Sequence, residues 1–562
     1  MRRTHDRTRS ARARGAAVGG AALGAALCAG AARPAAAQGL GMMAAGRLAD
    51  WSDAAVGSEE EMYLRVLQVA GVARSTPWSL RPLDGAQSRG LPPDTARHPW
   101  AARARFGDPR ARASFELLAP GVQAVYNSGY PFSLNDGFAW TGRGMTVAAR
   151  GGFAARWQPS RRIVLSARVE PQVAWTANRR TDIVPNGLTG PQRFGDALEP
   201  TVIDNPQRFG DRAFARATLG QSTVRVDAFG VAVGASTANQ WFGPALVDPL
   251  VLGTNAAGFP HVFVGTSRPV NLGIGTAHVR VQAGRLSQSD YSTVPVGEAR
   301  RLLTAVTAVA TVRGVPGLEL GGTRLFHGQW PDDGDFGPRL RALTQGFFFT
   351  GGDPANGVVQ NQLASVFGRW AWPGFEVYGE YLRNDANLDL RDFWQEPDHD
   401  AGYTVGARRV WRRPDGTLTA FRFETLNTRI GHLNRLRYQT RPYQHTPIRQ
   451  GHTEAGEVLG SAAAQGGLAT TLGWDRYRAD GRWTAEAARR VVRSSLGEGA
   501  PERRWDVVNY VRVERLRFGR RQDVVAGVTA MAELNRNFGR DAYQLRLDGG
   551  VRFGTLRRPG GR

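Results

Sequence analysis

The segment 543–553 near the C-terminus alternates strictly between two kinds of side chain. One set of alternate positions is apolar and begins and ends with an aromatic residue, while the other set contains Gln544, Arg546, Asp548 and Arg552. Successive side chains of a β-strand point to opposite faces, so this segment has one apolar face and one charged face. A span of about ten residues bracketed by aromatics is typical of a strand that crosses a membrane around a polar lumen.

Similar alternating segments follow one another from about Phe115 to the end of the chain. Segments 145–157 and 163–175 flank a tight turn and predict a hairpin. Short turns and long connections both recur, as in the outer-membrane barrels, which have periplasmic turns and extracellular loops. We therefore predict that residues 109–562 form an all-β, antiparallel outer-membrane β-barrel of roughly 16–18 strands. The long connections are expected at 176–211, 240–269, 328–361 and 428–467.

The composition limits both the classes of protein to which the chain can belong and the kinds of partner that it is expected to bind. No long apolar run lies outside the N-terminus, which excludes a helical membrane protein. The 562 residues carry a formal charge of +23, and all 72 basic residues are arginine. Arginine binds carboxylate and phosphate groups, which suits acidic polysaccharide or lipopolysaccharide, although a GC-rich genome explains the arginine content equally well. Nucleic acid is not expected, because the arginines are spread over alternating strands.

The N-terminal segment 1–37 has the features of a secretory signal peptide. Six arginines precede the Ala/Gly-rich segment 15–32, and small residues lead up to an expected cleavage between Ala37 and Gln38. The chain is thus expected to be exported and inserted in the cell outer membrane. Cys28, the single cysteine, lies in this segment, so no disulfide or cysteine metal site is expected after cleavage.

Residues 38–108 are predicted to form a short helical region on the periplasmic side. Ser58 and Glu61 are spaced as a capping box, and apolar residues follow at helical spacing. Gly71 and Pro77 end the pattern. The helix is expected either to pack at the mouth of the barrel or to lie alone on the surface.

A series of short motifs follows in order along the chain: Trp140-Thr-Gly-Arg-Gly144, Asn239-Gln-Trp-Phe-Gly-Pro244, Val251-Leu-Gly-Thr-Asn-Ala-Ala-Gly-Phe-Pro260, Ile274-Gly-Thr276, Gly284-Arg-Leu-Ser-Gln-Ser-Asp-Tyr291, Val315-Pro-Gly-Leu-Glu-Leu-Gly-Gly-Thr-Arg-Leu-Phe-His327, Tyr378-Gly-Glu-Tyr381, Glu396-Pro-Asp-His399 and Gly451-His-Thr-Glu-Ala-Gly-Glu-Val-Leu-Gly460. In this order the motifs resemble the capsule assembly protein Wzi family. That resemblance implies an outer-membrane barrel of about eighteen strands with a small periplasmic helical part. It also implies a surface lectin that binds exported capsular polysaccharide and helps to hold it on the cell, without enzymatic activity or cofactors.

Candidate glycan contacts occur in two of the long connections. Aromatic faces cover the C–H surfaces of sugars, and amides bind their hydroxyls. This composition suggests a glycan contact within 240–269, although the same residues suit a loop folded on itself or a plug. In the preceding connection, a pair of arginines is suited to an acidic glycan, although exposed charges contribute little singly. The candidates are Trp241, Phe242, Asn255, His261, Arg179 and Arg180.

Two other functions remain open. Arginines on the predicted lumen face suit a porin that passes anionic solutes. An outer-membrane hydrolase would need a serine and a histidine, for which Ser287, His278 and His327 are candidates. Phosphate-loop, zinc-protease and nucleophile-elbow motifs are absent from the sequence, and we predict a monomeric, non-enzymatic barrel with no cofactor or metal.

Overall fold

The computed structural model describes residues 55–73, 76–83, 98–101, 112–331, 360–384, 390–430, 437, 439–494 and 505–553. The predicted signal peptide with its cleavage site at Ala37 and Gln38, and most of 38–108, lie outside these ranges. Within them, no helix is both long enough and apolar enough to cross a membrane.

Strands account for most of the described elements, and helices are few. The helical elements are α3 (Glu59–Val69), α6 (Leu390–Gln395), η3 (Gly190–Phe194) and η4 (Val296–Glu298). The strands are β1 (Leu80–Arg81), β2 (Ala113–Asn127), β3 (Gly144–Ser160), β4 (Ile163–Val169), β5 (Gln172–Thr176), β6 (Phe214–Thr218), β7 (Thr223–Ala228), β8 (Val231–Ser236), β9 (Trp241–Phe242), β10 (His261–Thr266), β11 (Val270–Asn271), β12 (Gly275–Leu286), β13 (Arg301–Val312), β14 (Leu318–Gln329), β15 (Gln360–Trp372), β16 (Phe375–Asn384), β17 (Ala401–Arg412), β18 (Leu418–Asn427), β19 (Thr453–Glu454), β20 (Glu457–Val458), β21 (Leu468–Arg478), β22 (Gly481–Ser494), β23 (Trp505–Phe518), β24 (Gln522–Arg536) and β25 (Arg540–Phe553).

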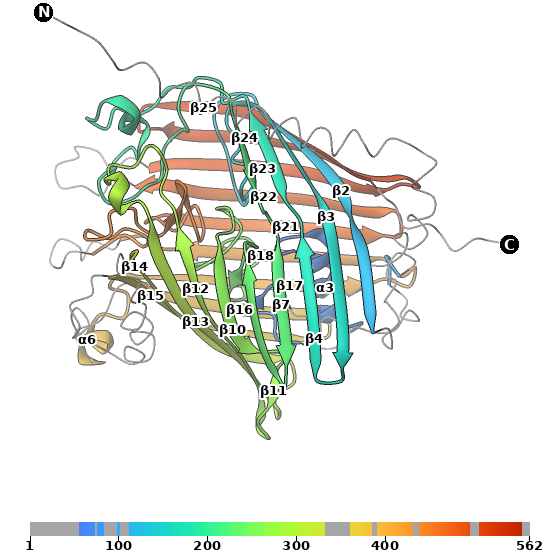
Figure 1. The fold of residues 1–562 in the computed structure, drawn as a ribbon. Coiled ribbons are helices and arrows are strands. Elements are labelled where there is room, and N and C mark those ends of the chain that lie inside the picture. The colour runs from blue at the N-terminus through green and yellow to red at the C-terminus, as the bar shows by residue number, and fades with distance from the viewer. Residues whose placement is uncertain are drawn as a thin grey trace, which may run out of the picture.

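Twenty-one of these strand segments form one closed antiparallel barrel (Figure 1). The first and last barrel strands, β2 and β25, pair from Gly121 with Arg552 to Asn127 with Arg546, and this pairing closes the barrel. Three strands of the barrel are each divided into two segments, β4/β5, β6/β7 and β10/β11. The two segments of a divided strand bond, one after the other, to the same neighbouring strand. Counted as continuous strands, the segments make an 18-stranded barrel, which confirms the predicted fold.

The alternation predicted for the C-terminal segment is present in β25. Tyr543 and Leu545 are 71% and 53% exposed on the outside, whereas Gln544, Arg546 and Asp548 are buried inside. An outer face of apolar side chains around a charged interior is the arrangement that a lipid environment requires. Exposed aromatic residues gather on the outer face near the short-turn ends of the strands: Phe115, Trp157, Trp370, Trp372, Trp411, Trp483 and Phe553.

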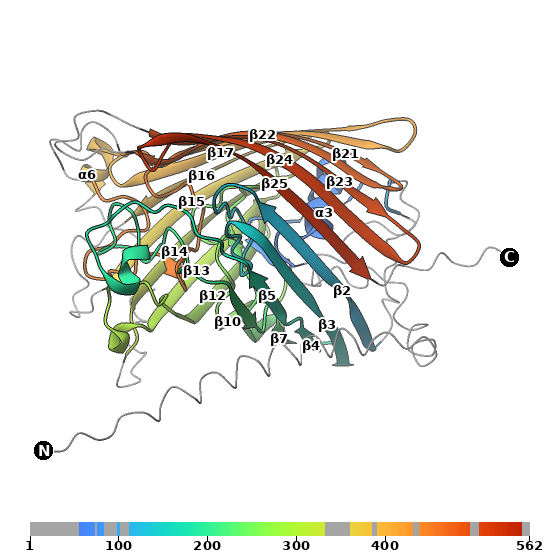
Figure 2. The ribbon, with the colours of Figure 1, turned by 90° about the horizontal axis from the view of Figure 1, so that it is seen from above.

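The two ends of the barrel differ in their connections. Short turns join strands at one end, for example at 373–374 between β15 and β16, and long loops join them at the other, as predicted (Figure 2). The connection predicted at 240–269 is shorter than expected, because His261–Thr266 forms strand β10. The alternation in β10 is only six residues long, and Pro260 and Pro269 flank it, so the sequence suggested a loop.

Helix α3 lies inside the short-turn end of the barrel and not on an outer surface. The Ser58 side chain caps it by accepting from Glu61 N at 3.3 Å, and Glu61 accepts from Gly57 N at 2.6 Å. Val69 O accepts from Gly374 N in the β15–β16 turn at 2.6 Å, which fixes the end of the helix beside a short turn. Its buried side chains pack with inward residues of the barrel strands: Val410, Leu418, Ala420, Tyr477 and Leu516.

Candidate functional site

Two segments enter the barrel from opposite ends and meet inside it. The N-terminal segment enters with α3, and the β8–β10 loop folds in from the other end; β1 of the first pairs with β9 of the second, Leu80 opposite Phe242 and Arg81 opposite Trp241. Arg81 lies 4.6 Å from the centroid of the Trp241 ring and donates to Ala245 O at 3.0 Å. Because the β1–β9 sheet joins them, the two segments form one internal plug.

Buried carboxylates on the barrel wall hold both parts of this plug by their backbone N–H groups. Glu319 on β14 accepts from Trp78 N at 2.7 Å in the N-terminal segment. Glu424 on β18 accepts from Leu246 N at 2.6 Å, and also from the next two backbone amides of the β8–β10 loop. A carboxylate that accepts several N–H bonds in a dry site makes strong, charge-assisted contacts. These charged side chains of the lumen, which the sequence predicted, thus bind backbone groups of the plug.

Ion pairs tie helix α3 to the wall in the same way. Arg65 is fully buried, and its Nε lies 3.2 Å from Glu376 on β16, which also pairs with Arg369 and Arg408. Arg482 pairs with Glu59 at 2.7 Å, and Arg552 with Glu60. The helix is therefore held at three places around the lumen.

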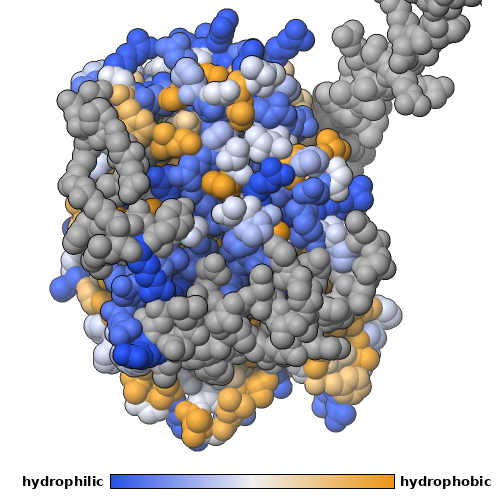
Figure 3. Space-filling view, turned by 90° about the vertical axis from the view of Figure 1, so that its left-hand side faces the viewer, coloured by the Kyte–Doolittle hydropathy of each residue, from blue (hydrophilic) through white to orange (hydrophobic). Residues whose placement is uncertain are grey.

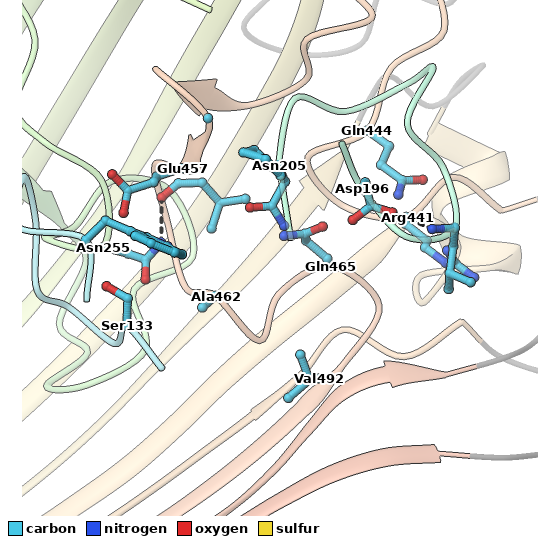
Figure 4. Close-up of a pocket in the computed structure, with 15 residues that line it drawn as sticks. Ser133, Asp196, Asn205, Asn255, Arg441, Gln444, Glu457, Ala462, Gln465 and Val492 are labelled. Carbon is cyan, nitrogen blue, oxygen red and sulfur yellow. Dashed lines mark hydrogen bonds between the residues drawn. The ribbon is translucent and has the colours of Figure 1, made fainter. Parts of the chain in front are cut away.

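A pocket of about 150 Å³ opens among the long loops (Figure 4). Its lining comes from the β2–β3, β5–β6, β8–β10 and β18–β21 loops and from strand β22. The face at this end of the barrel, shown in Figure 3, is mostly hydrophilic among the described residues. The lining residues are Ser133, Trp140, Asp196, Leu198, Asn205, Pro206, Asn255, Arg441, Gln444, Gly456, Glu457, Val458, Ala462, Gln465 and Val492.

Side-chain amides dominate the polar lining of the pocket. Asn205 and Gln465 point toward one another in Figure 4, and Gln444 lies beyond them near Asp196 and Arg441. An amide offers both donors and acceptors, which matches the hydroxyl groups of a sugar. Trp140 adds an aromatic side chain, which is held by edge-on contact with Phe209 at 4.9 Å between centroids.

The loops that carry these amides are fixed by buried hydrogen bonds. Asp204, next to Asn205, accepts from Ser289 N at 2.6 Å in the β12–β13 loop. Tyr443, next to Gln444, donates to Leu250 O at 2.6 Å in the β8–β10 loop. These contacts join loops that are far apart in the sequence, so the pocket is preformed.

The charged groups of the pocket are already compensated by protein groups. Asp196 Oδ1 accepts from Leu198 N and Glu199 N, each at 2.9 Å, and Arg441 pairs with Glu199 at 2.7 Å. Burial raises the pKa of Glu457 to about 8, partly offset by Arg216, whose Nη1 lies 3.4 Å from the carboxylate. Glu457 is therefore largely protonated at neutral pH and can donate a hydrogen bond.

The structure separates the predicted glycan residues into three groups. Asn255 lines the pocket and donates to Val458 O at 3.0 Å. Trp241, Phe242 and His261 do not line the pocket; they are 3%, 1% and 5% exposed, respectively, inside the plug and the barrel wall. Their aromatic composition suited a sugar and a packed loop equally well, and burial favours the packed loop.

Arg179 and Arg180 are exposed at the start of the β5–β6 loop. Their backbone is held by the neighbouring β2–β3 loop, since Arg179 N donates to Arg143 O at 2.9 Å and the Arg143 guanidinium donates to Arg180 O at 2.9 Å. They lie on the loop end of the barrel but do not line the pocket.

Most of the pocket residues were missed by composition alone, because they come from separate loops. Two signals in the sequence do point to them. Trp140 opens the motif 140–144, and Glu457 lies within the motif 451–460, both of which carry the family resemblance.

Of the two histidines considered for hydrolysis, His278 lies far from Ser287, and His327 is hydrogen-bonded to Asn361. His278 lies near the short-turn end of β12 and is hydrogen-bonded to Thr266 at 2.6 Å, whereas Ser287 follows the loop end of the same strand. At about 3.3 Å per residue, this separation approaches 30 Å. His327 contacts Asn361 at 3.0 Å. Within the described ranges, no group of three or more His, Cys, Asp or Glu residues is arranged to hold a metal ion.

The model of the family "Capsule assembly protein Wzi" matches residues 143–495. No curated protein matches the sequence. A solved structure of Wzi from Escherichia coli is described as an outer membrane protein involved in group 1 capsule assembly and a carbohydrate-binding β-barrel. It is 14% identical, and the alignment covers 89% of this chain and 99% of that chain with a TM-score of 0.58.

Two further solved structures are less similar to this chain. OccAB4 of Acinetobacter baumannii is 8% identical over 79% of this chain and 99% of its own, with a TM-score of 0.38. OccK5 of Pseudomonas aeruginosa is 9% identical over 78% and 98%, with a TM-score of 0.36. Likeness at this level says nothing about function. The match of the family model over more than half of the sequence, together with the 18-stranded barrel, shows that this chain is an outer-membrane protein that belongs to the capsule assembly protein Wzi family.

Proposed function

We propose that this barrel binds the polysaccharide of its own cell surface at the loop end and helps to anchor it to the cell, without catalysing a reaction. The observation that supports this most is the preformed pocket among the long loops, with Trp140, four side-chain amides and a protonated Glu457. Pockets for small ligands combine an apolar surface with a few converging polar groups, and here both come from rigid loops. The carbohydrate binding described for the Escherichia coli relative agrees with this proposal.

The arginines of the loop end extend the proposed contact beyond the pocket. Arg179 and Arg180 are exposed beside the β2–β3 loop, which also carries Trp140. An acidic polymer seated in the pocket would gain screened attraction from them, so binding of the whole polymer should weaken with salt.

A binding experiment tests the proposal directly. Purified protein in detergent is titrated with the extracellular polysaccharide of the host at low and high salt. Saturable binding that Asn205→Ala combined with Gln465→Ala weakens, and that Gln395→Ala on α6 leaves unchanged, is the expected result. In cells lacking this chain, capsule release into the medium should rise; unchanged attachment would contradict the anchoring role.

The alternative function as a porin needs an open lumen. The described plug segments meet across the β1–β9 sheet and are fixed by buried Glu319, Glu424 and Glu376. This arrangement favours a closed barrel. Planar-bilayer recordings distinguish the two functions, because a steady open conductance of the unmodified protein would favour the porin.

The remaining partners follow from the outer surface. We propose that the barrel works as a monomer and is exported with a signal peptide cleaved between Ala37 and Gln38. The exposed aromatic residues near the short-turn ends of the strands would contact membrane lipid. The short turns beyond these aromatic residues expose many arginines, which suits lipid phosphates, and the loop end would border lipopolysaccharide. The exposed turn arginines include Arg161, Arg162, Arg313, Arg413, Arg478 and Arg521.

A further inference from the structure

The loop pocket is small, and the arginines at its described lining are already held by carboxyl groups; these two properties restrict the sugar that it can hold. Pockets for drug-sized ligands usually measure about 300–1,000 Å³. The volume of about 150 Å³ found here is well below that range and corresponds to a single sugar residue of a polymer. The rest of the chain would have to leave the pocket toward the open loop end.

The charged side chains around the pocket are the second property that restricts the ligand. Arg441, the one arginine among the described lining residues, is paired with Glu199 at 2.7 Å. Asp196 is 6% exposed, and its Oδ1 is occupied by two backbone amides. Arg441 is held by Glu199, and Arg216 lies 3.4 Å from the Glu457 carboxyl, so both of these arginines are already engaged by protein carboxyl groups. A carboxylate brought into the pocket would lose part of its hydration without gaining a free cation among the described lining residues, and it would lie close to the charge of Asp196.

The polar groups that remain suit hydroxyls. Asn205, Gln444 and Gln465 each present a donor and an acceptor from a different part of the lining. Glu457, protonated at neutral pH, adds a further donor. None of these groups requires a charged ligand for its hydrogen bonds.

From this arrangement we infer that the pocket binds one uncharged sugar residue of the polysaccharide and rejects a uronic acid residue at the same place. This inference rests on the proposed function and refines it. Any acidic residues of the polymer then lie outside the pocket, near Arg179 and Arg180. Recognition is divided between a neutral pocket, which gives specificity, and an arginine surface, which gives salt-dependent attraction.

Saturation-transfer NMR with small probes tests the inference. The probes are the methyl glycosides of glucose, galactose and mannose and the methyl glycosides of the corresponding uronic acids, each titrated against the full-length protein in detergent. At least one neutral glycoside should bind at least tenfold more tightly than its uronic counterpart. This binding should not change with salt. Asn205→Ala and Gln465→Ala should weaken it, whereas Gln395→Ala should not.

A charge variant makes the test specific to the stated cause. Asp196→Asn keeps the oxygen that accepts from Leu198 N and Glu199 N but removes the charge. The preference for the neutral glycoside should fall by at least threefold in this variant. Folding of each variant is checked by its heat-dependent mobility in gels.

The outcomes separate the inference from the function on which it rests. Tighter binding of a uronic glycoside, or binding of the whole polysaccharide without any response to the neutral glycosides, would overturn the inference and leave the lectin function standing. Binding of a neutral glycoside in the pocket, with no binding of the host polysaccharide, would support the pocket chemistry and refute the proposed function.

Discussion

Replacing Arg65 by alanine should loosen helix α3 inside the barrel. Arg65 and Glu376 are both fully buried, 311 residues apart in the sequence, and joined at 3.2 Å. The guanidinium also lies 5.1 Å from the centroid of the Tyr378 ring. Breaking a buried ion pair by removing one partner costs about 3–5 kcal/mol. The lower end applies here, because Arg369 and Arg408 remain beside Glu376 and keep its charge compensated.

A loss of about 3 kcal/mol in the local stability of the helix corresponds to a more than 100-fold rise in its open population. Hydrogen exchange of the backbone amides of α3 measures this population, because local opening limits the exchange of protected amides. The exchange of amides 62–69 should accelerate by that factor in the Arg65→Ala protein, while the barrel strands keep their protection. Planar-bilayer recordings of the same variant should show opening events that the unmodified protein lacks.

A matched control is available in Arg540→Ala. Arg540 also pairs with a distant carboxylate, Asp182, at 2.8 Å, but both side chains are more than three-quarters exposed. Exposed pairs contribute little to stability, so this variant should exchange like the unmodified protein. If the amides of α3 exchange equally slowly in the Arg65→Ala and Arg540→Ala proteins, the reasoning that the buried pair holds the helix is refuted.

Three further changes have defined outcomes. Ser58→Ala removes the cap of α3 and should cost about 1 kcal/mol, seen as several-fold faster exchange in the first helical turn; unchanged exchange there would speak against the cap. Burial raises the pKa of Glu457 from 4.5 to about 8, so its contribution to stability is complete below pH 4.5 and lost as the pH rises through 8. The protection factors of amides 453–458, which correct for the intrinsic rise of exchange with pH, should fall over that range in the unmodified protein and fall less in Glu457→Gln, where Glu454, whose pKa burial raises to about 7, still titrates; an unchanged slope in the variant would assign the effect elsewhere. Gly152→Ala would place a Cβ against the Val169 carbonyl, where β3 passes from β4 to β5, and should sharply reduce the yield of heat-modifiable barrel in gels; a normal yield would mean that the strands can shift apart.

Short sequence patterns were enough to predict the barrel, because a strand that faces lipid on one side requires an apolar side chain at every second residue. The outward Tyr543 and Leu545 and the inward Arg546 are distinguished by a period of two, which needs no knowledge of the partner strand. The capping box at Ser58 and Glu61 was readable for the same reason, since both residues belong to one helical turn. The approximate strand count and the two unlike ends of the barrel followed from the same patterns.

The contents of the lumen could not be read from these patterns. A charged residue on the inner face is compatible with water, an ion or a protein plug, and Arg65 shows that the partner can be hundreds of residues away. The same uncertainty affected Trp241, because an aromatic loop residue suits a sugar face or a packed core, and only its pairing in the β1–β9 sheet placed it inside the plug.

The sequence by itself determined the membrane barrel, its capped helix and its family, since each depends on short segments or on ordered motifs. The tertiary structure alone decided that α3 and the β8–β10 loop meet inside the barrel, and that Asn205, Asn255 and Gln465 share one pocket. These three amides come from three loops that are brought together by buried contacts such as that of Tyr443 with Leu250. Long-range packing between loops has no periodic trace in the sequence, so a pocket built by it becomes visible only when the chain is folded.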